Sequence, residues 1–159
     1  MQNEFLKIAN DPLRFRFYML LKLPAAFLSG LRVKKATLEA TTVCLSFHWL
    51  SQNPFRSIYF ASLAMAAEMS TGLLAMARIY KKKPAVSMLV VSMEAKFFKK
   101  ATGTIYFSCQ DGSLFEAAIQ KAMDSEESTT LTATANGTNK LGELVAQFYF
   151  TWSFKRKNK

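Results

Sequence analysis

The segment SIYFASLAMAAEMSTGLLAMA, Ser57–Ala77, contains one charged residue, Glu68. A helix this apolar is buried over most of its surface. One long buried helix needs a sheet that curves around it, so the segment predicts an α+β domain with this helix at its centre. A buried, ionised carboxylate is costly unless a partner or a shifted pKa compensates it, and such costs concentrate at functional sites. Glu68 is therefore the first candidate for a functional residue.

The composition is that of one globular domain. The chain has 159 residues, of which 50% are hydrophobic, enough to bury a core without disulfides or metals. Its net charge of +10 favours anionic partners, such as nucleotide phosphates, acidic substrates, membrane surfaces or nucleic acid. Part of this charge belongs to residues 156–159, which we expect to be a solvated basic tail. No recognised nucleic-acid-binding module is visible, so we expect no nucleic-acid partner.

Three features bear on the compartment. Ser57–Ala77 has nearly the length of a membrane span, but a glutamate at the centre of a span costs about 2.5–3.5 kcal/mol in lipid, so we expect no membrane span. The N-terminal residues lack the pattern of a secretory signal. Cys44 and Cys109 stand at no metal-ligand spacing and are expected to be small apolar core residues in a reducing compartment. Together these features predict a cytoplasmic protein.

Hydrophobic periodicity and helix-breaking residues divide the rest of the chain into short elements. We expect one or two short helices over residues 3–28, with a helix start at Asp11-Pro12. The period-two pattern of Val33–Trp49 predicts one long first strand. The remaining predictions are strands at 85–99, 103–109, 128–136 and 143–154, a helix at 113–124 that opens with a capping box, and a turn at Asn136-Gly137.

Two segments carry a resemblance to a known family. One runs from Asn53 through Tyr59-Phe60-Ala61 to Glu68, and the other is FFKKATG, Phe97–Gly103. They resemble the hotdog fold, in which an antiparallel sheet wraps a central helix. More narrowly, they are similar to acyl-CoA thioesterases of the phenylacetic-acid-degradation type and to a related branch without an assigned function. The resemblance covers about Leu31–Phe154, most of the chain. With the helices and the tail expected from the residues, the chain divides into an N-terminal helical segment at 1–30, a hotdog domain at 31–155 and the basic tail at 156–159.

The resemblance also implies which residues form a site. Glu68 falls on the helix carboxylate that these thioesterases use as base or nucleophile, and Asn53 falls on the loop asparagine at the mouth of the site. Tyr59, Phe60 and Ala61 stand where the family has His-Gly-Gly, whose backbone amides form an oxyanion hole. Ala64, Met65 and Gly72 share the helix face of Glu68 and could leave a channel for an acyl chain, and Lys99 and Lys100 could contact CoA phosphates.

The leading function implied is hydrolysis of an acyl-CoA thioester. The alternatives are a non-catalytic protein that holds an acyl-CoA or fatty acid, and a structural dimer without a ligand. A packing explanation of Glu68 also stays open, in which a backbone amide or an arginine compensates its charge. No metal site and no cofactor beyond the CoA of the substrate are expected, and His48, the only histidine, is expected to cap a strand end near the mouth with Asn53. The family pattern implies a homodimer or tetramer.

Overall fold

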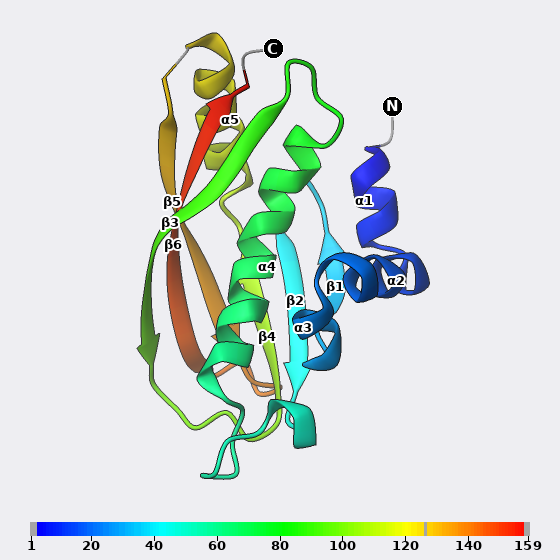
Figure 1. Ribbon diagram of the computed structural model, residues 1–159. Helices are drawn as coiled ribbons and strands as arrows, with labels where there is room; N and C mark the ends of the chain where they lie inside the picture. The colour runs from blue at the N-terminus through cyan, green and yellow to red at the C-terminus, as the bar shows by residue number, and fades with distance from the viewer. Residues whose placement is uncertain (1–2, 126, 158–159) are drawn as a thin grey trace.

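The computed structural model describes residues 3–125 and 127–157. In chain order the elements are α1 Glu4–Ala9, α2 Pro12–Lys22, α3 Pro24–Leu28, β1 Arg32–Ala36, β2 Thr41–Ser46, the 3-10 helix η1 Trp49–Ser51, α4 Phe60–Ile79, β3 Val86–Phe97, β4 Thr104–Cys109, α5 Gly112–Asp124, β5 Thr129–Thr138 and β6 Leu144–Arg156. The strands form one six-stranded antiparallel sheet in the order β1-β2-β4-β5-β6-β3. Figure 1 shows this sheet curving behind α4, with α1–α3 beside the β1 edge. The predicted α+β hotdog fold is confirmed.

The central helix follows the prediction closely. α4 buries most of its residues between the sheet and the N-terminal helices, and its last turn carries Arg78, which suits the negative end of a helix dipole. α4 is long and apolar enough to cross a membrane, but 67% of its most apolar stretch is buried inside the domain. It is a core helix of this fold. The strict alternation predicted for the last strand is also present, because β6 buries Phe148, Phe150, Trp152 and Phe154. Full burial of such side chains contributes about 1.5–3 kcal/mol each.

The first strand prediction was wrong. Val33–Trp49 is not one strand but the hairpin of β1 and β2 followed by η1. The reversal is set by Thr37, whose hydroxyl accepts from the amides of Glu39 and Ala40 and donates to the Ala40 carbonyl. Such local hydroxyl-to-backbone bonds offer the chain an alternative to the sheet ladder. The period-two pattern continued through the turn and concealed it.

Two smaller predictions also fail. Asn136-Gly137 is part of β5 and not a turn, because Gly137 pairs with Phe107 on β4 and a Cβ at this glycine would lie 2.5 Å from the phenyl ring. The turn comes later, where the Asn139 side chain accepts from two backbone amides. α5 begins at Gly112, so Ser113 is not its cap. Asp111 precedes the helix, and its carboxylate accepts from the Thr134 amide instead.

The N-terminal region forms three short helices where one or two were expected. Asp11 caps α2 as predicted, since its carboxylate accepts from the amides of Leu13 and Arg14. α1 and α2 pack on β1, and α1 also touches α4. Of the predicted basic tail, Arg156 ends β6 and Lys157 follows it, while residues 158–159 lie outside the described residues. Cys44 and Cys109 are buried free thiols, consistent with their predicted packing role.

Candidate functional site

Glu68 opens onto a cavity of about 210 Å³ between α4 and the N-terminal helices. No other residue that lines this cavity is charged: the lining side chains are Phe5, Phe15, Tyr18, Leu23, Met69, Gly72, Leu73, Met76, Met88 and Trp152. Within residues 3–125 and 127–157, the Glu68 carboxylate forms no ion pair. The sheet and helices thus hold a lone carboxylate against an apolar hollow.

The surroundings of Glu68 change its proton affinity. Burial raises the pKa of the Glu68 carboxyl from 4.5 to about 7, because the ionised form loses hydration and gains no compensating cation. Arg78, ten residues further along α4, is turned elsewhere: it donates to the Leu74 carbonyl and lies 3.8 Å from the Glu116 carboxylate. An arginine clamp on Glu68 is therefore not the arrangement found. A carboxyl with a pKa near neutrality can both hold and release a proton under ordinary conditions.

Gly72 and Trp152 lie next to the carboxylate. A Cβ at Gly72 would lie 3.4 Å from Glu68 Oε1 and 3.5 Å from the Trp152 ring, in van der Waals contact with both. The indole is fixed in position because its Nε1 donates to Thr71 Oγ1 at 2.9 Å. The Thr71 hydroxyl in turn donates to the Glu68 backbone carbonyl at 2.9 Å. One wall of the cavity is thus tied to the helix turn that carries Glu68.

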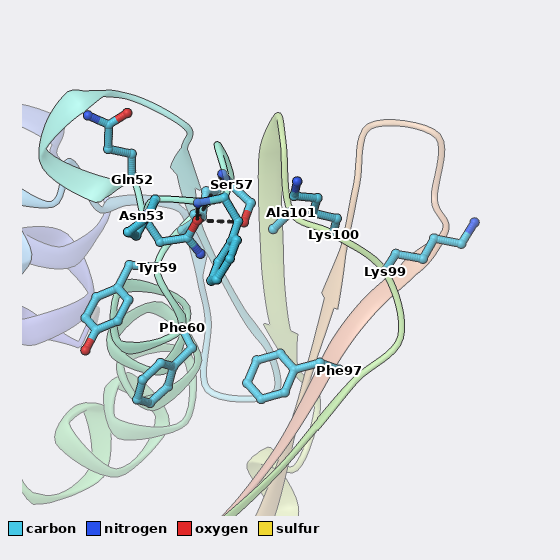
Figure 2. A pocket seen from close by; sticks show the side chains of 12 residues that line it. Gln52, Asn53, Ser57, Tyr59, Phe60, Phe97, Lys99, Lys100 and Ala101 are labelled. Atoms are coloured by element: carbon cyan, nitrogen blue, oxygen red, sulfur yellow. Dashed lines mark hydrogen bonds between the residues drawn. The ribbon is translucent and has the colours of Figure 1, made fainter.

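A second hollow of about 520 Å³ lies at the N-terminal end of α4 (Figure 2). Many of the predicted site residues line it: Asn53, Tyr59, Phe60, Lys99 and Lys100, together with Gln52, Pro54, Phe55, Ser57, Ile58, Phe97 and Ala101. Glu68 does not line this hollow, and Asn53 does not line the Glu68 cavity. The structure of one chain therefore divides the predicted site into two hollows along the same helix.

Asn53 organises the loop that precedes α4. Its Oδ1 accepts from the amides of Phe55 and Ser57 and from the Ser57 hydroxyl, the bonds drawn as dashes in Figure 2. The loop also contains Arg56 in the left-handed region, at φ 56°. The side-chain oxygen of Asn53, Oδ1, therefore has all its hydrogen bonds within the loop. Any contact with a ligand is left to the amide nitrogen of this side chain.

The start of α4 offers two backbone donors. The amides of Ser62 and Leu63 donate to the Tyr59 carbonyl, and the Tyr59 side chain forms no cap. Among the described residues no acceptor faces the amides of Phe60 and Ala61, as is usual for the first turn of a helix. These are the amides that the resemblance assigns to an oxyanion hole. The half-exposed Phe60 ring stands beside them, edge-on to Tyr59 at a centroid distance of 5.0 Å.

Ala61, Ala64 and Met65 line neither hollow. They are half-buried and share the helix face of Glu68. At about 1.5 Å of rise per residue, this strip of α4 covers about 10 Å between the helix start and Glu68. The strip lies between the two hollows along the helix.

The two lysines differ in their surroundings. Lys99 and Lys100 follow β3 on the opposite side of the second hollow from Tyr59 (Figure 2). Lys99 Nζ binds the Glu143 carboxylate. The hydrogen bonds from Lys99 and Asn139 lower the pKa of the Glu143 carboxyl. Lys100 forms no ion pair within the described part of the chain. Lys100 is thus the freer of the two to meet an anion.

His48 is held by structural bonds. Its Nδ1 accepts from the Leu50 amide at 3.2 Å, so Nε2 carries the proton that is donated to the Ser29 carbonyl at 3.0 Å. Gly30 allows this contact, since a Cβ there would lie 2.9 Å from Nε2. His48 lines a different hollow, on the β1–β2–β4 side, and not the mouth that contains Asn53. His48 caps the 3-10 helix η1 and not a strand end, so the predicted strand cap was wrong.

The sequence interpretation missed the contribution of the N-terminal helices. Phe5, Phe15, Tyr18 and Leu23 close the Glu68 cavity, although this region carries no recognised motif. The spacing of Phe15, Tyr18 and Met19 on one helical face was the available signal for burial. No group of three or more His, Cys, Asp or Glu side chains with metal-binding geometry occurs among the described residues.

Several solved structures have a similar fold. A protein of unknown function from Pseudomonas aeruginosa, described as a probable thioesterase, is 18% identical with a TM-score of 0.77, covering 92% of this chain and 97% of its own. A protein of unknown function from Chlorobaculum tepidum is 13% identical with a TM-score of 0.76 over 92% and 97% of the two chains. A thioesterase from Haemophilus influenzae is 8% identical with a TM-score of 0.66 over 88% of each chain.

At these identities the structural likeness establishes the hotdog fold. No significant match is found among curated proteins. A sequence family does match, over residues 14–154, which is most of the chain. The match includes every residue that lines the two hollows except Phe5. The chain belongs to this family, described as a domain of unknown function (DUF4442).

Proposed function

We propose that this protein hydrolyses an acyl-CoA thioester and that Glu68 is its general base. The observation that carries the proposal is the lone Glu68 carboxylate at an apolar cavity, where burial raises its pKa to about 7. A general base works best when its pKa lies near the operating pH. Two solved structures of the same fold support this reaction class, one described as a probable thioesterase and one as a thioesterase.

In the proposed mechanism the Glu68 carboxylate removes a proton from a water molecule as the water oxygen attacks the thioester carbon. The carbonyl oxygen becomes a tetrahedral oxyanion, which the amides of Phe60 and Ala61 stabilise from the helix start. The carbon–sulfur bond then breaks, and the thiolate takes up the proton. The products are the free acid and CoA, so one water is consumed for each thioester.

The distance along α4 fits this division of labour. Glu68 lies seven residues after Ala61, about 10 Å along the axis, and side chains on a helix lean toward its N-terminus. A water and a thioester group fit between a carboxylate and an amide at that separation. Lys100 and Lys99 at the rim of the second hollow would meet the CoA phosphates.

One observation favours a second candidate, a non-catalytic acyl-CoA or fatty-acid carrier. The Phe60 ring stands beside the two free amides, where a thioester carbonyl has to approach. If this ring stays in place, an acyl chain can still bind along the half-buried strip of α4 without reaching the amides.

A panel of acyl-CoA esters of increasing chain length, assayed with a thiol-trapping dye and by thermal shift, separates the two candidates. An enzyme releases thiol in proportion to its concentration, and turnover survives removal of contaminants by repeated chromatography. If the protein is a carrier, the bound ester raises its melting temperature and no thiol is released. If the protein shows neither thiol release nor a thermal shift, both proposals are contradicted.

We also propose that the protein is a homodimer paired along β3. This strand is an edge of the sheet, yet it exposes apolar residues at alternate positions, with Leu89 67% and Val91 57% exposed. A long apolar edge is a surface for pairing with another strand. Phe97 ends β3 and lines the second hollow, so a copy paired along β3 would lie beside the proposed CoA rim.

Replacing Leu89 and Val91 together with lysine is expected to convert the dimer into a monomer of 17.9 kDa. Lysines on an edge strand oppose strand pairing because two copies would bring like charges together. Light scattering coupled to size-exclusion chromatography measures the mass. The matched control is Leu141→Lys, at an exposed residue of the β5–β6 turn. A double variant that keeps the mass of the unmodified protein would contradict pairing along β3.

A further inference from the structure

The outward face of α2 is apolar. α2 turns Phe15 and Met19 into the core. On the opposite face Leu13, Phe17 and Leu21 are 81%, 61% and 62% exposed. A surface helix of a water-soluble domain usually places polar side chains there. This helix therefore presents an apolar face that nothing in the described chain covers.

The apolar surface continues past α2. Leu20 and Leu23 are exposed on and just after the helix, and Leu28 at the end of α3 is exposed as well. Leu28 and Leu50 line the hollow that also contains Arg16. Grouped exposed apolar side chains of this kind mark a contact surface, whereas single ones need no explanation.

The adjoining hollow, of about 570 Å³, is strongly basic. Its charged lining residues are all cations, namely Arg16, Arg32, Lys34 and Lys140, and no Asp or Glu lines it. None of these four forms an ion pair within the described residues. Positive charge gathered without a counter-charge attracts an anionic partner.

Local structure fixes the cations beside the apolar face. Arg32 and Lys34 both line the hollow from β1, where Lys34 lies at a β-bulge opposite β2. The Arg16 guanidinium lies over the Phe27 ring, 4.6 Å from its centroid. Arg16 belongs to α2 itself, so it marks the boundary between the apolar face and the basic hollow. On the other flank of the face, Arg14 pairs with Asp11 at 3.3 Å.

We propose that α2, α3 and the basic hollow form a docking surface for a membrane that contains anionic phospholipids. The exposed leucines and Phe17 enter the boundary between headgroups and acyl chains, and Arg16, Arg32 and Lys34 receive the lipid phosphates. An amphipathic helix that lies in the interface has this combination of an apolar face and flanking basic residues. The net charge of +10 adds a general attraction to the same surface. The proposal concerns docking and is independent of the thioester chemistry.

Sedimentation with large vesicles tests the docking directly, without any acyl-CoA. The whole protein is expected to sediment with vesicles of equal parts phosphatidylglycerol and phosphatidylcholine, and to stay in solution with phosphatidylcholine alone. High salt should release it, because added ions screen the attraction. The variant pair Arg32→Gln and Lys34→Gln should bind about 25-fold more weakly, since each cation near an anionic surface contributes about fivefold.

Two further variants separate the parts of the surface. Phe17→Gln with Leu21→Gln should also lose sedimentation, while the control pair Leu114→Gln with Lys121→Gln on α5 should sediment normally. α5 lies away from α1–α3 in Figure 1. All these positions are exposed, and circular dichroism with a melting curve verifies that each variant folds.

Three sedimentation results would each overturn the proposal: no sedimentation with anionic vesicles, equal sedimentation with neutral ones, or retained sedimentation in the Phe17 and Leu21 variant. Soluble glycerol phosphate distinguishes a free phosphate as the source of the anion. If glycerol phosphate displaced the protein from vesicles at a concentration that hardly changes the ionic strength, the hollow would be a small-molecule site. A loss of dimer mass in the Phe17 and Leu21 variant would instead assign the apolar face to a second copy and reject the membrane.

Discussion

Replacing Glu68 with glutamine is expected to lower kcat for acyl-CoA hydrolysis by at least about 100-fold, since a positioned general base contributes about 10²–10⁴-fold. Glutamine keeps the size of the side chain and removes only its capacity to accept a proton. In the unmodified protein kcat should rise with pH and level off above about 7, because the ionised carboxylate is the active form and burial raises its pKa to about 7. Steady-state assays with the best ester of the panel measure both effects.

The control for this experiment is Glu127→Gln. Glu127 is exposed and lies at neither hollow, so its replacement should leave kcat and its pH dependence unchanged. A Glu68→Gln protein with unchanged kcat would exclude this carboxylate as the base. Loss of activity with the same thermal shift on ligand binding would separate loss of chemistry from loss of the acyl site.

The fold could be predicted because its main signals are local and strong. The apolar run that forms α4 and the alternation in β6 each extend over many residues, and both survive in the structure. The hairpin of β1 and β2 could not be found in this way. Its turn depends on the side-chain hydrogen bonds of Thr37. These bonds end the first strand, but the alternation of hydrophobic residues continues through the turn. Gly137 is the opposite case: a turn-like dipeptide stays in a strand because the Phe107 ring needs the space of a missing side chain.

The site was predicted less completely, for a physical reason. Position along α4 predicted that Glu68 would be buried among small and apolar residues. The surroundings are apolar, but Gly72 is the only small residue that lines the cavity. Part of its cavity wall comes from α1 and α2, which are distant in sequence and have no motif that indicates where they pack. Likewise, Asn53 lies where the resemblance implies, at the loop before α4, but its carbonyl oxygen is committed to that loop. The hydrogen-bond partners of a side chain depend on tertiary structure and cannot be predicted from the spacing of residues in the sequence.

Glu68 should also make the stability of this protein depend on pH in a particular direction. The carboxyl has a pKa of 4.5 in an unfolded chain and about 7 in the folded protein. As pH rises through this interval, the unfolded chain releases the proton first, so the folded state loses stability relative to it. Below about pH 4.5 the group is protonated in both states, and above about pH 7 it is ionised in both, so the loss is complete there.

Glu68→Gln removes this titration, and the variant is therefore expected to gain stability relative to the unmodified protein as pH rises. The gain between pH 4 and pH 8 should be about 3 kcal/mol in the free energy of unfolding, since one pKa unit corresponds to about 1.4 kcal/mol. Urea unfolding of both proteins across this range measures it, and the other titrating groups cancel in the difference. A difference that does not change with pH would mean that Glu68 ionises as an exposed glutamate does. In that case the carboxylate would lack the raised pKa on which its role as a base depends, whatever the activity assays report.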